Sequence, residues 1–126
     1  MAHKRVLIIE DEDANREVAR INLELVGDWE GSTCGSGAEG LVIAKEQQPD
    51  AILLDVMMPD MDGSATFKEL QREEATKNIP VILLTGKERP SEHHNFNGLG
   101  VRGVFAKPFG PLTLASDASK VLGWPP

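Results

Sequence analysis

Short apolar runs alternate along the chain with segments whose apolar residues recur every three or four positions. The clearest runs are Val6–Ile9, Ala51–Leu54, Val81–Leu84 and Val104–Ala106. They are largely unbroken, which is typical of parallel strands covered on both faces. A more modest strand is expected near Trp29–Thr33. The pattern therefore predicts five strands.

Helices are predicted between these strands. The first lies between Asp13, placed to cap its start, and Gly27, placed to end it, and its apolar stripe is Ala14, Val18, Ile21 and Leu25. Ser36 and Glu39 have the spacing of a capping box. The helix behind them stops before Pro49 and has the stripe Ala38, Leu41 and Ala44.

Three further helices complete the pattern. Phe67 and Leu70 mark a third helix after Gly63, and Ser91–Leu99 is a weaker candidate for a fourth. The last helix starts at Pro111 and stops at Gly123, with the stripe Leu114, Ala118, Val121 and Leu122.

Five strand and helix units in alternation predict an α/β fold, with an open parallel sheet and helices on both of its faces. The length of 126 residues fits a single domain that can bury its core without disulfides. We expect that domain to span 1–126, with a core of about 4–123 and a short C-terminal tail.

Composition narrows the classes of function. Thirteen Lys and Arg against twenty Asp and Glu give a net charge of −7, which disfavours direct binding of nucleic acid or of an anionic membrane. Val6–Ile9 is too short for the apolar part of a signal peptide, and no run reaches membrane-spanning length. The single cysteine, Cys34, cannot form an internal disulfide, so a cytoplasmic protein is predicted, and Cys34 itself is interpreted as a small core residue.

Polar residues follow the apolar runs directly. Glu10 and Asp11 come after the first run, and Asp55, Thr85 and Lys107 follow the three other clear runs. Singly, each residue could be a cap, a turn residue or a surface charge. Together they are more informative, because ligands of open parallel sheets bind at the carboxyl ends of the strands.

Crowded carboxylates repel one another unless a cation lies between them. Mg²⁺ suits such a set, whereas no cluster of Cys and His offers zinc four ligands. Beside Mg²⁺, the carboxylate of Asp55 could attack a phosphorus atom, while Lys107 and Thr85 bind oxygens of the transferring group.

Four motifs in this order resemble response regulator receiver domains of two-component signalling, in particular single-domain regulators of the chemotaxis type. They are Val6–Glu12, Leu54–Gly63, Leu84–Gly86 and Ala106–Phe109. The resemblance spans nearly the whole chain, and its most specific part is Asp-x-x-Met-Pro-x-Met-Asp-Gly from Asp55 to Gly63. It implies a flavodoxin-like, doubly wound sheet of five strands in the order 2-1-3-4-5 with five helices.

The resemblance also implies roles for the acidic residues. Asp55 would be the phosphoacceptor. Asp11 and Asp55 would bind Mg²⁺ directly, Glu10 would act through its water shell, and the backbone carbonyl of Met57 would complete the protein ligands.

Further roles follow for the later motifs. Thr85 and Lys107 would sense the phosphoryl group, and the bond from Lys107 to Pro108 is expected to be cis. The family commonly has an aromatic switch residue three positions before the lysine. Here Val104 occupies that position, with Phe105 beside it, so the usual coupling between threonine and aromatic ring is not expected in the same form.

Met57 and Lys87 supply no amide or acid to orient a water molecule toward the phosphoryl group. This leads to the hypothesis that the phosphoryl group is hydrolysed slowly.

The leading hypothesis is a stand-alone response regulator. It would accept a phosphoryl group from a histidine kinase or phosphotransfer protein and signal to a downstream effector through protein contacts, with homodimerisation left open. Such a phosphoacceptor assists its own phosphorylation and dephosphorylation and turns over no separate substrate.

The alternatives are a receiver domain excised from a larger regulator, an unphosphorylated receiver-like binding module, and a small phosphatase with an aspartyl nucleophile. A nucleotide-binding domain fits less well, because no Gly-rich loop follows the first strand.

Overall fold

A parallel β-sheet forms the centre of the structure, a computed structural model that describes residues 4–25, 29–55, 63–86, 103–107, 118 and 120–123. Within these ranges five strands pair in the order β2-β1-β3-β4-β5, all in parallel. Their bounds are β1 Arg5–Ile9, β2 Glu30–Cys34, β3 Ala51–Asp55, β4 Val81–Gly86 and β5 Gly103–Lys107. The predicted sheet and its strand order are confirmed.

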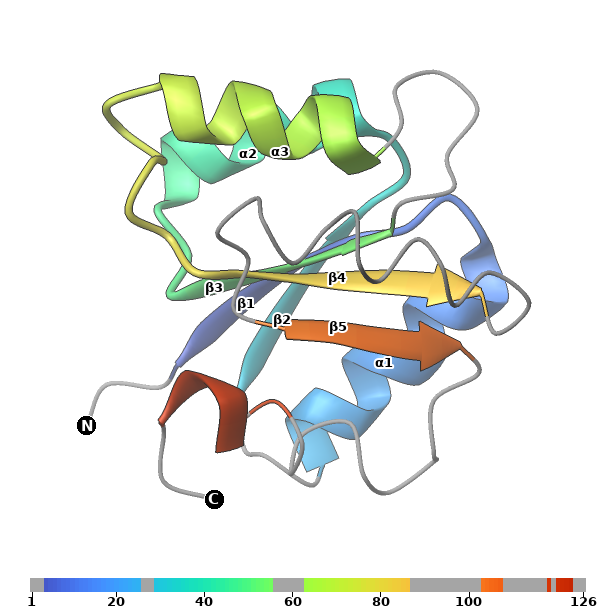
Figure 1. Ribbon diagram of the computed structural model, residues 1–126. Helices are drawn as coiled ribbons and strands as arrows, with labels where there is room; N and C mark the ends of the chain where they lie inside the picture. The colour runs from blue at the N-terminus through green and yellow to red at the C-terminus, as the bar shows by residue number, and fades with distance from the viewer. Residues whose placement is uncertain are drawn as a thin grey trace.

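Helices cover both faces of this sheet (Figure 1). The described helices are α1 Asp13–Leu25, α2 Gly37–Gln47 and α3 Gly63–Arg72, and residues 118 and 120–122 are also helical. α2 and α3 lie on one face, and α1 and the helical residues 118 and 120–122 lie on the other (Figure 1). The fourth predicted helix at Ser91–Leu99, the start of the last helix at Pro111 and the C-terminal tail lie outside the described residues.

Two apolar clusters separate the sheet from its helices. Under α2 and α3, the buried cluster consists of Leu7, Ile9, Cys34, Ala44, Ile52, Leu54, Phe67, Leu70, Val81 and Leu83. Under α1, it consists of Val6, Ile8, Ala19, Leu23, Trp29, Leu53, Ile82, Leu84 and Ala118. Alternate residues of each central strand enter opposite clusters, which explains why these strands are apolar without interruption.

The edge strand β2 differs from the central strands in sequence and in burial. It runs from Glu30 to Cys34, one residue later than predicted, and only Cys34 of this strand is buried. Trp29 is also buried, and its backbone N–H donates to the carbonyl of Leu23 at 3.1 Å. The edge position accounts for the weak apolar signal of this segment, since fewer neighbours cover it.

The helix α1 begins at Asp13 as predicted, but its predicted apolar stripe is wrong. Val18 and Ile21 are 46% and 45% exposed, and Ala14 is exposed as well. Among the side chains of α1 that the structure describes, the buried ones are Ala19, Asn22 and Leu23. The contact face was misassigned because it combines a small and a polar residue with a single large apolar one. The side chain of Leu25 and the residue Gly27 lie outside the description.

The helix α2 starts at the predicted cap. Ser36 has the extended backbone of an N-cap, and its hydroxyl accepts a hydrogen bond from the backbone N–H of Glu39 at 3.2 Å. The helix ends at Gln48, which adopts a left-handed conformation with φ of 51° just before Pro49. Both ends of α2 were therefore predicted correctly.

The contact face of α2 departs from its predicted stripe. Ala38 is exposed, whereas Gly40 and Ala44 are buried and Leu41 is partly buried. A Cβ atom on Gly40 would lie 2.3 Å from Cδ1 of Ile9, so the absence of a side chain allows α2 to approach β1 closely.

The helices in the described part of the chain are all too short or too polar to cross a membrane.

Candidate functional site

Strand register places two acidic residues at the same level of the sheet. Ile9 at the end of β1 pairs with Leu54 in β3, so the next residues, Glu10 and Asp55, emerge side by side. After β1 the chain enters α1 on one face, and α3, which follows β3, lies on the other. This is the topological switch point of the sheet, where open α/β folds bind their ligands.

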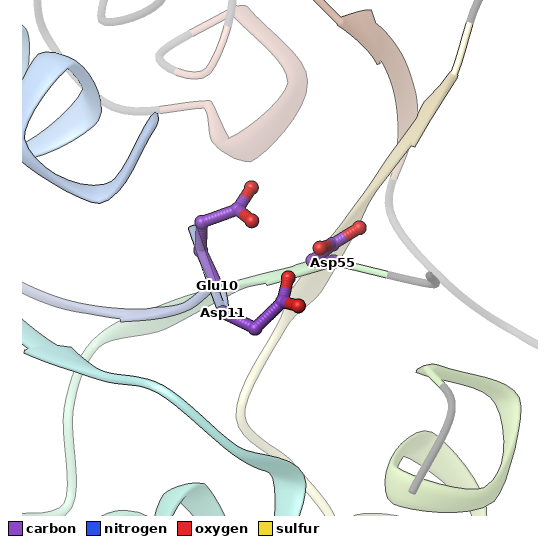
Figure 2. A group of neighbouring side chains, drawn as sticks. All are labelled: Glu10, Asp11 and Asp55. Atoms are coloured by element: carbon purple, nitrogen blue, oxygen red, sulfur yellow. The ribbon is translucent and has the colours of Figure 1, made fainter. Parts of the chain in front are cut away.

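Three carboxyl groups meet at this point (Figure 2). One carboxylate oxygen from each of Glu10, Asp11 and Asp55 lies within 4.8 Å of the other two. Glu10 and Asp55 are fully buried, whereas Asp11 is partly exposed to solvent. The predicted convergence of these residues is therefore present, and one member of the cluster remains accessible.

Backbone and side-chain hydrogen bonds fix the segment that carries Glu10. Its N–H donates to the carbonyl of Cys34 at 3.1 Å, and its carboxylate accepts from the N–H of Glu12 at 3.1 Å. Its carbonyl accepts from the guanidinium of Arg16 at 2.9 Å. The residue is thus held from β2, from α1 and from its own loop.

The donor set fits a hard divalent cation. Carboxylate oxygens are the ligands that Mg²⁺ prefers. Since the three oxygens lie within 4.8 Å of one another, a cation at the cluster could be bound by them directly or through water. In the described part of the chain, this is the one group of three or more acidic, His or Cys side chains with such spacing.

The backbones of Thr85 and Lys107 lie at the same edge of the sheet. Asp55 pairs with Leu84, and Thr85 follows Leu84. Gly86 pairs with Lys107, the last residue of β5. Four strand ends that carry the predicted chemistry therefore share one edge, but the side chains of Thr85 and Lys107 lie outside the description.

Several other predicted site residues are described only in part or not at all. Val104 and Phe105 lie in β5, where their backbones pair with Leu83 and Leu84, and their side chains lie outside the description. Three predicted residues lie outside the described ranges altogether, namely Met57, Lys87 and Pro108.

Two further residues border the cluster. Arg16 was not among the predicted site residues, because its partner at the cluster is the backbone carbonyl of Glu10. Cys34 is buried as interpreted, and burial raises the pKa of its thiol to about 11, so the thiol stays protonated at neutral pH. Cys34 therefore acts as a core residue.

The sheet order and the carboxylate cluster at its switch point define an α/β domain of the flavodoxin-like type with an acidic site. The family model of the response regulator receiver domain matches residues 6–118. The chain belongs to this family, whose members are the phosphoacceptors of two-component signalling.

Solved receiver domains have the same fold along nearly the whole chain. A putative response regulator from Chloroflexus aurantiacus is 29% identical with a TM-score of 0.88, and the match covers 97% of this chain and 99% of that one. Chemotaxis protein CheY4 of Vibrio cholerae is 30% identical with a TM-score of 0.86, over 95% and 99% of the two chains. The receiver domain of the sensor histidine kinase PA1611 from Pseudomonas aeruginosa is 27% identical with a TM-score of 0.84, covers 97% and 99%, and contains a magnesium ion in its active site cleft.

Curated relatives include transcriptional regulators. RpaA of Synechocystis, a DNA-binding regulator, is 35% identical over 83% of this chain and 43% of its own length. PhoB of Pseudomonas aeruginosa, a regulator of the phosphate regulon, is 34% identical over 97% of this chain and 53% of its own length. The chain spans about half the length of these relatives.

Proposed function

We propose that this chain accepts a phosphoryl group on the carboxylate of Asp55 from a histidine kinase or a phosphotransfer protein. The observation that carries the proposal is the cluster of Glu10, Asp11 and Asp55 at the switch point of a receiver-family sheet. Asp55 ends the fully buried strand β3, so its position is fixed by the core.

Each acidic residue then has a distinct part. When bound, Mg²⁺ would screen the repulsion between the carboxylate and the phosphate. Asp11 and Asp55 would hold the ion directly, with Met57 through its carbonyl and Glu10 through water. An oxygen of Asp55 forms a bond to phosphorus while the bond from phosphorus to the donor breaks, and the donor leaves with the electron pair.

Thr85 and Lys107 would report the modified state. The phosphoryl group adds roughly two negative charges, and the ammonium of Lys107 and the hydroxyl of Thr85 would each bind one of its oxygens. Val104 and Phe105 would form the adjoining switch, and the bond from Lys107 to Pro108 would be cis. Support for these roles is the shared edge of β4 and β5 and the resemblance of the motifs.

We further propose that the chain is a single cytoplasmic domain that acts as a stand-alone regulator and signals to an effector protein. The net charge of −7 supports a protein partner over direct contact with nucleic acid. The mass of the protein isolated from its native cells tests the stand-alone role, because a mass about twice that of this chain would indicate a receiver domain within a larger regulator. Light scattering before and after phosphorylation would detect homodimerisation.

The acceptor is tested by intact mass after incubation with acetyl phosphate, with and without Mg²⁺. We expect a Mg²⁺-dependent gain of one phosphoryl group with release of acetate, and we expect Asp55→Asn to abolish it. The matched control is Asp50→Asn before β3, because Asp50 accepts from the N–H of Arg5 at 2.8 Å and lies outside the cluster. A gain that persists in Asp55→Asn would overturn the assignment. No gain in any protein would favour the unphosphorylated binding module.

The lifetime of the phosphoryl group is a separate proposal. Neither Met57 nor Lys87 supplies an amide or acid that could orient water, so we expect hydrolysis to take minutes or longer. Following the loss of added mass over time tests this expectation, and loss within seconds would contradict it. Rapid turnover of a phosphorylated metabolite would instead support a phosphatase.

A further inference from the structure

Arg16 connects the helix α1 to the acidic cluster. Its Nη1 atom donates to the backbone carbonyl of Glu10 at 2.9 Å, and its Nη2 atom forms an ion pair with Asp13. The side chain is 22% exposed, so most of it is packed within the protein. A hydrogen bond from a charged donor is stronger than one between neutral groups.

A second observation concerns the space around this guanidinium. A Cβ atom on Gly35 would lie 3.1 Å from Nη1 of Arg16, which is tighter than an ordinary contact. Gly35 directly follows Cys34, whose carbonyl accepts from the N–H of Glu10 at 3.1 Å. The guanidinium therefore lies beside the segments that follow β1 and β2, and it donates to the first of them.

The bonded carbonyl belongs to the peptide group that joins Glu10 to Asp11. Because a peptide group is planar, fixing its carbonyl also fixes the direction in which the following residue leaves it. The two carboxylates that β1 brings toward Asp55 are attached to either end of this plane. A rotation of the plane would move the carboxylates of Glu10 and Asp11 relative to Asp55.

We infer that Arg16 is a positioning residue, which holds the peptide between Glu10 and Asp11 so that their carboxylates face Asp55. The inference rests on the proposed function in one respect, since it takes the cluster to be the Mg²⁺ site. Arg16 would not touch the ion or the phosphoryl group. It would set the geometry of the residues that do.

Charge and position make opposite predictions for this residue. As a nearby positive charge, Arg16 repels a cation, so its removal should strengthen Mg²⁺ binding. As a positioning group, its removal should weaken binding, and loss of a partner that orients metal ligands typically lowers metal affinity about 10-fold or more. The sign of the change therefore distinguishes the two roles.

The experiment is calorimetric titration of the unphosphorylated chain with Mg²⁺. We expect Arg16→Gln, which is neutral, to weaken binding about 10-fold. Arg16→Lys, which keeps the charge and one donor, should recover part of that loss. Gly35→Ala, which changes no charge, should weaken binding less than Arg16→Gln does, because the added methyl group would push the guanidinium by a few tenths of an ångström.

The control is Arg20→Gln, one turn further along α1. Arg20 pairs with Glu17 at 2.7 Å and with Glu24 at 2.8 Å, and neither belongs to the cluster. This substitution removes the same charge from the same helix. Because Arg20 makes its ion pairs away from the cluster, Mg²⁺ affinity should stay within about twofold of the wild type. Thermal unfolding without Mg²⁺ separates a general loss of stability from a change confined to binding.

The outcomes separate this inference from the proposed function. Wild-type binding that is lost in Asp55→Asn but unchanged or tighter in Arg16→Gln would overturn the positioning role and leave the Mg²⁺ site intact. Absence of binding by the wild type would overturn both. If Arg16→Gln fails to fold, Arg16→Lys and Gly35→Ala together carry the test, and affinity that is unchanged or tighter in both variants would overturn the inference.

Discussion

Replacing Gly40 by alanine should destabilise the protein, although the same change usually strengthens a helix. Gly40 lies inside α2 and faces the last residue of β1. An added Cβ atom would lie 2.3 Å from Cδ1 and 2.8 Å from Cγ1 of Ile9, closer than such atoms approach in real structures. Ile9 is fully buried, so its side chain cannot swing into solvent.

Two opposing terms set the size of the effect. On an open helix surface, Gly→Ala gains about 1 kcal/mol of helix propensity. Overpacking a tight core typically costs about 1–3 kcal/mol. Since two atoms of Ile9 would clash and its neighbours are also buried, we take the upper part of that range. The free energy of unfolding should therefore fall by about 1–2 kcal/mol.

Urea unfolding of Gly40→Ala with and without Ile9→Val measures this directly. Ile9→Val removes the Cδ1 atom and by itself should cost about 0.5–1.5 kcal/mol. In that background, Gly40→Ala should cost clearly less than in the wild type, since the nearest clash is gone. A rise in stability for Gly40→Ala alone, or an equal cost in both backgrounds, would refute the reasoning.

Two other predictions concern buried polar groups. The hydroxyl of Thr76 donates to the carbonyl of Leu70 at 2.7 Å in a buried setting, so Thr76→Val should lower the free energy of unfolding by about 1–3 kcal/mol. Thr76→Ser, measured in the same urea titration, should lose less, and equal losses would contradict the role of the hydroxyl. Burial raises the pKa of Cys34 from 9.0 to about 11, which lowers its thiolate fraction at pH 8 by about 100-fold. A disulfide reagent should react with the native thiol at least that much more slowly than with the unfolded one, and similar rates would contradict this.

The central strands were predictable because burial on both faces demands unbroken apolar runs, and β1, β3 and β4 have them. The faces of the helices were less accessible to sequence reasoning. In α1, Val18 and Ile21 gave a regular apolar stripe, yet the helix buries Asn22 beside Ala19 instead. Hydrophobic periodicity finds a helix from its large apolar residues, but it loses the contact face when small and polar residues pack there.

The acidic site was predictable for a different reason. Parallel strands end at one edge, so residues that follow them, such as Glu10 and Asp55, must approach one another whatever the details of packing. Arg16 was missed because its partner is a backbone carbonyl, and no residue type in the sequence marks such a partner. Side chains that bind the backbone are visible only once the fold is known.

The pairing of β1 with β3 also has a consequence for folding. Val6 pairs with Ala51, so the two halves of the acidic cluster come from segments far apart along the chain, with α1, β2 and α2 between them. Such non-local contacts form late relative to local helices, because a long loop must close first. Asp55 therefore remains apart from Glu10 and Asp11, and the repulsion between it and that pair is absent, until the centre of the sheet has assembled. A fragment that ends before β3 lacks Asp55 and should lack the cation site, so metal affinity would report the pairing of β1 with β3.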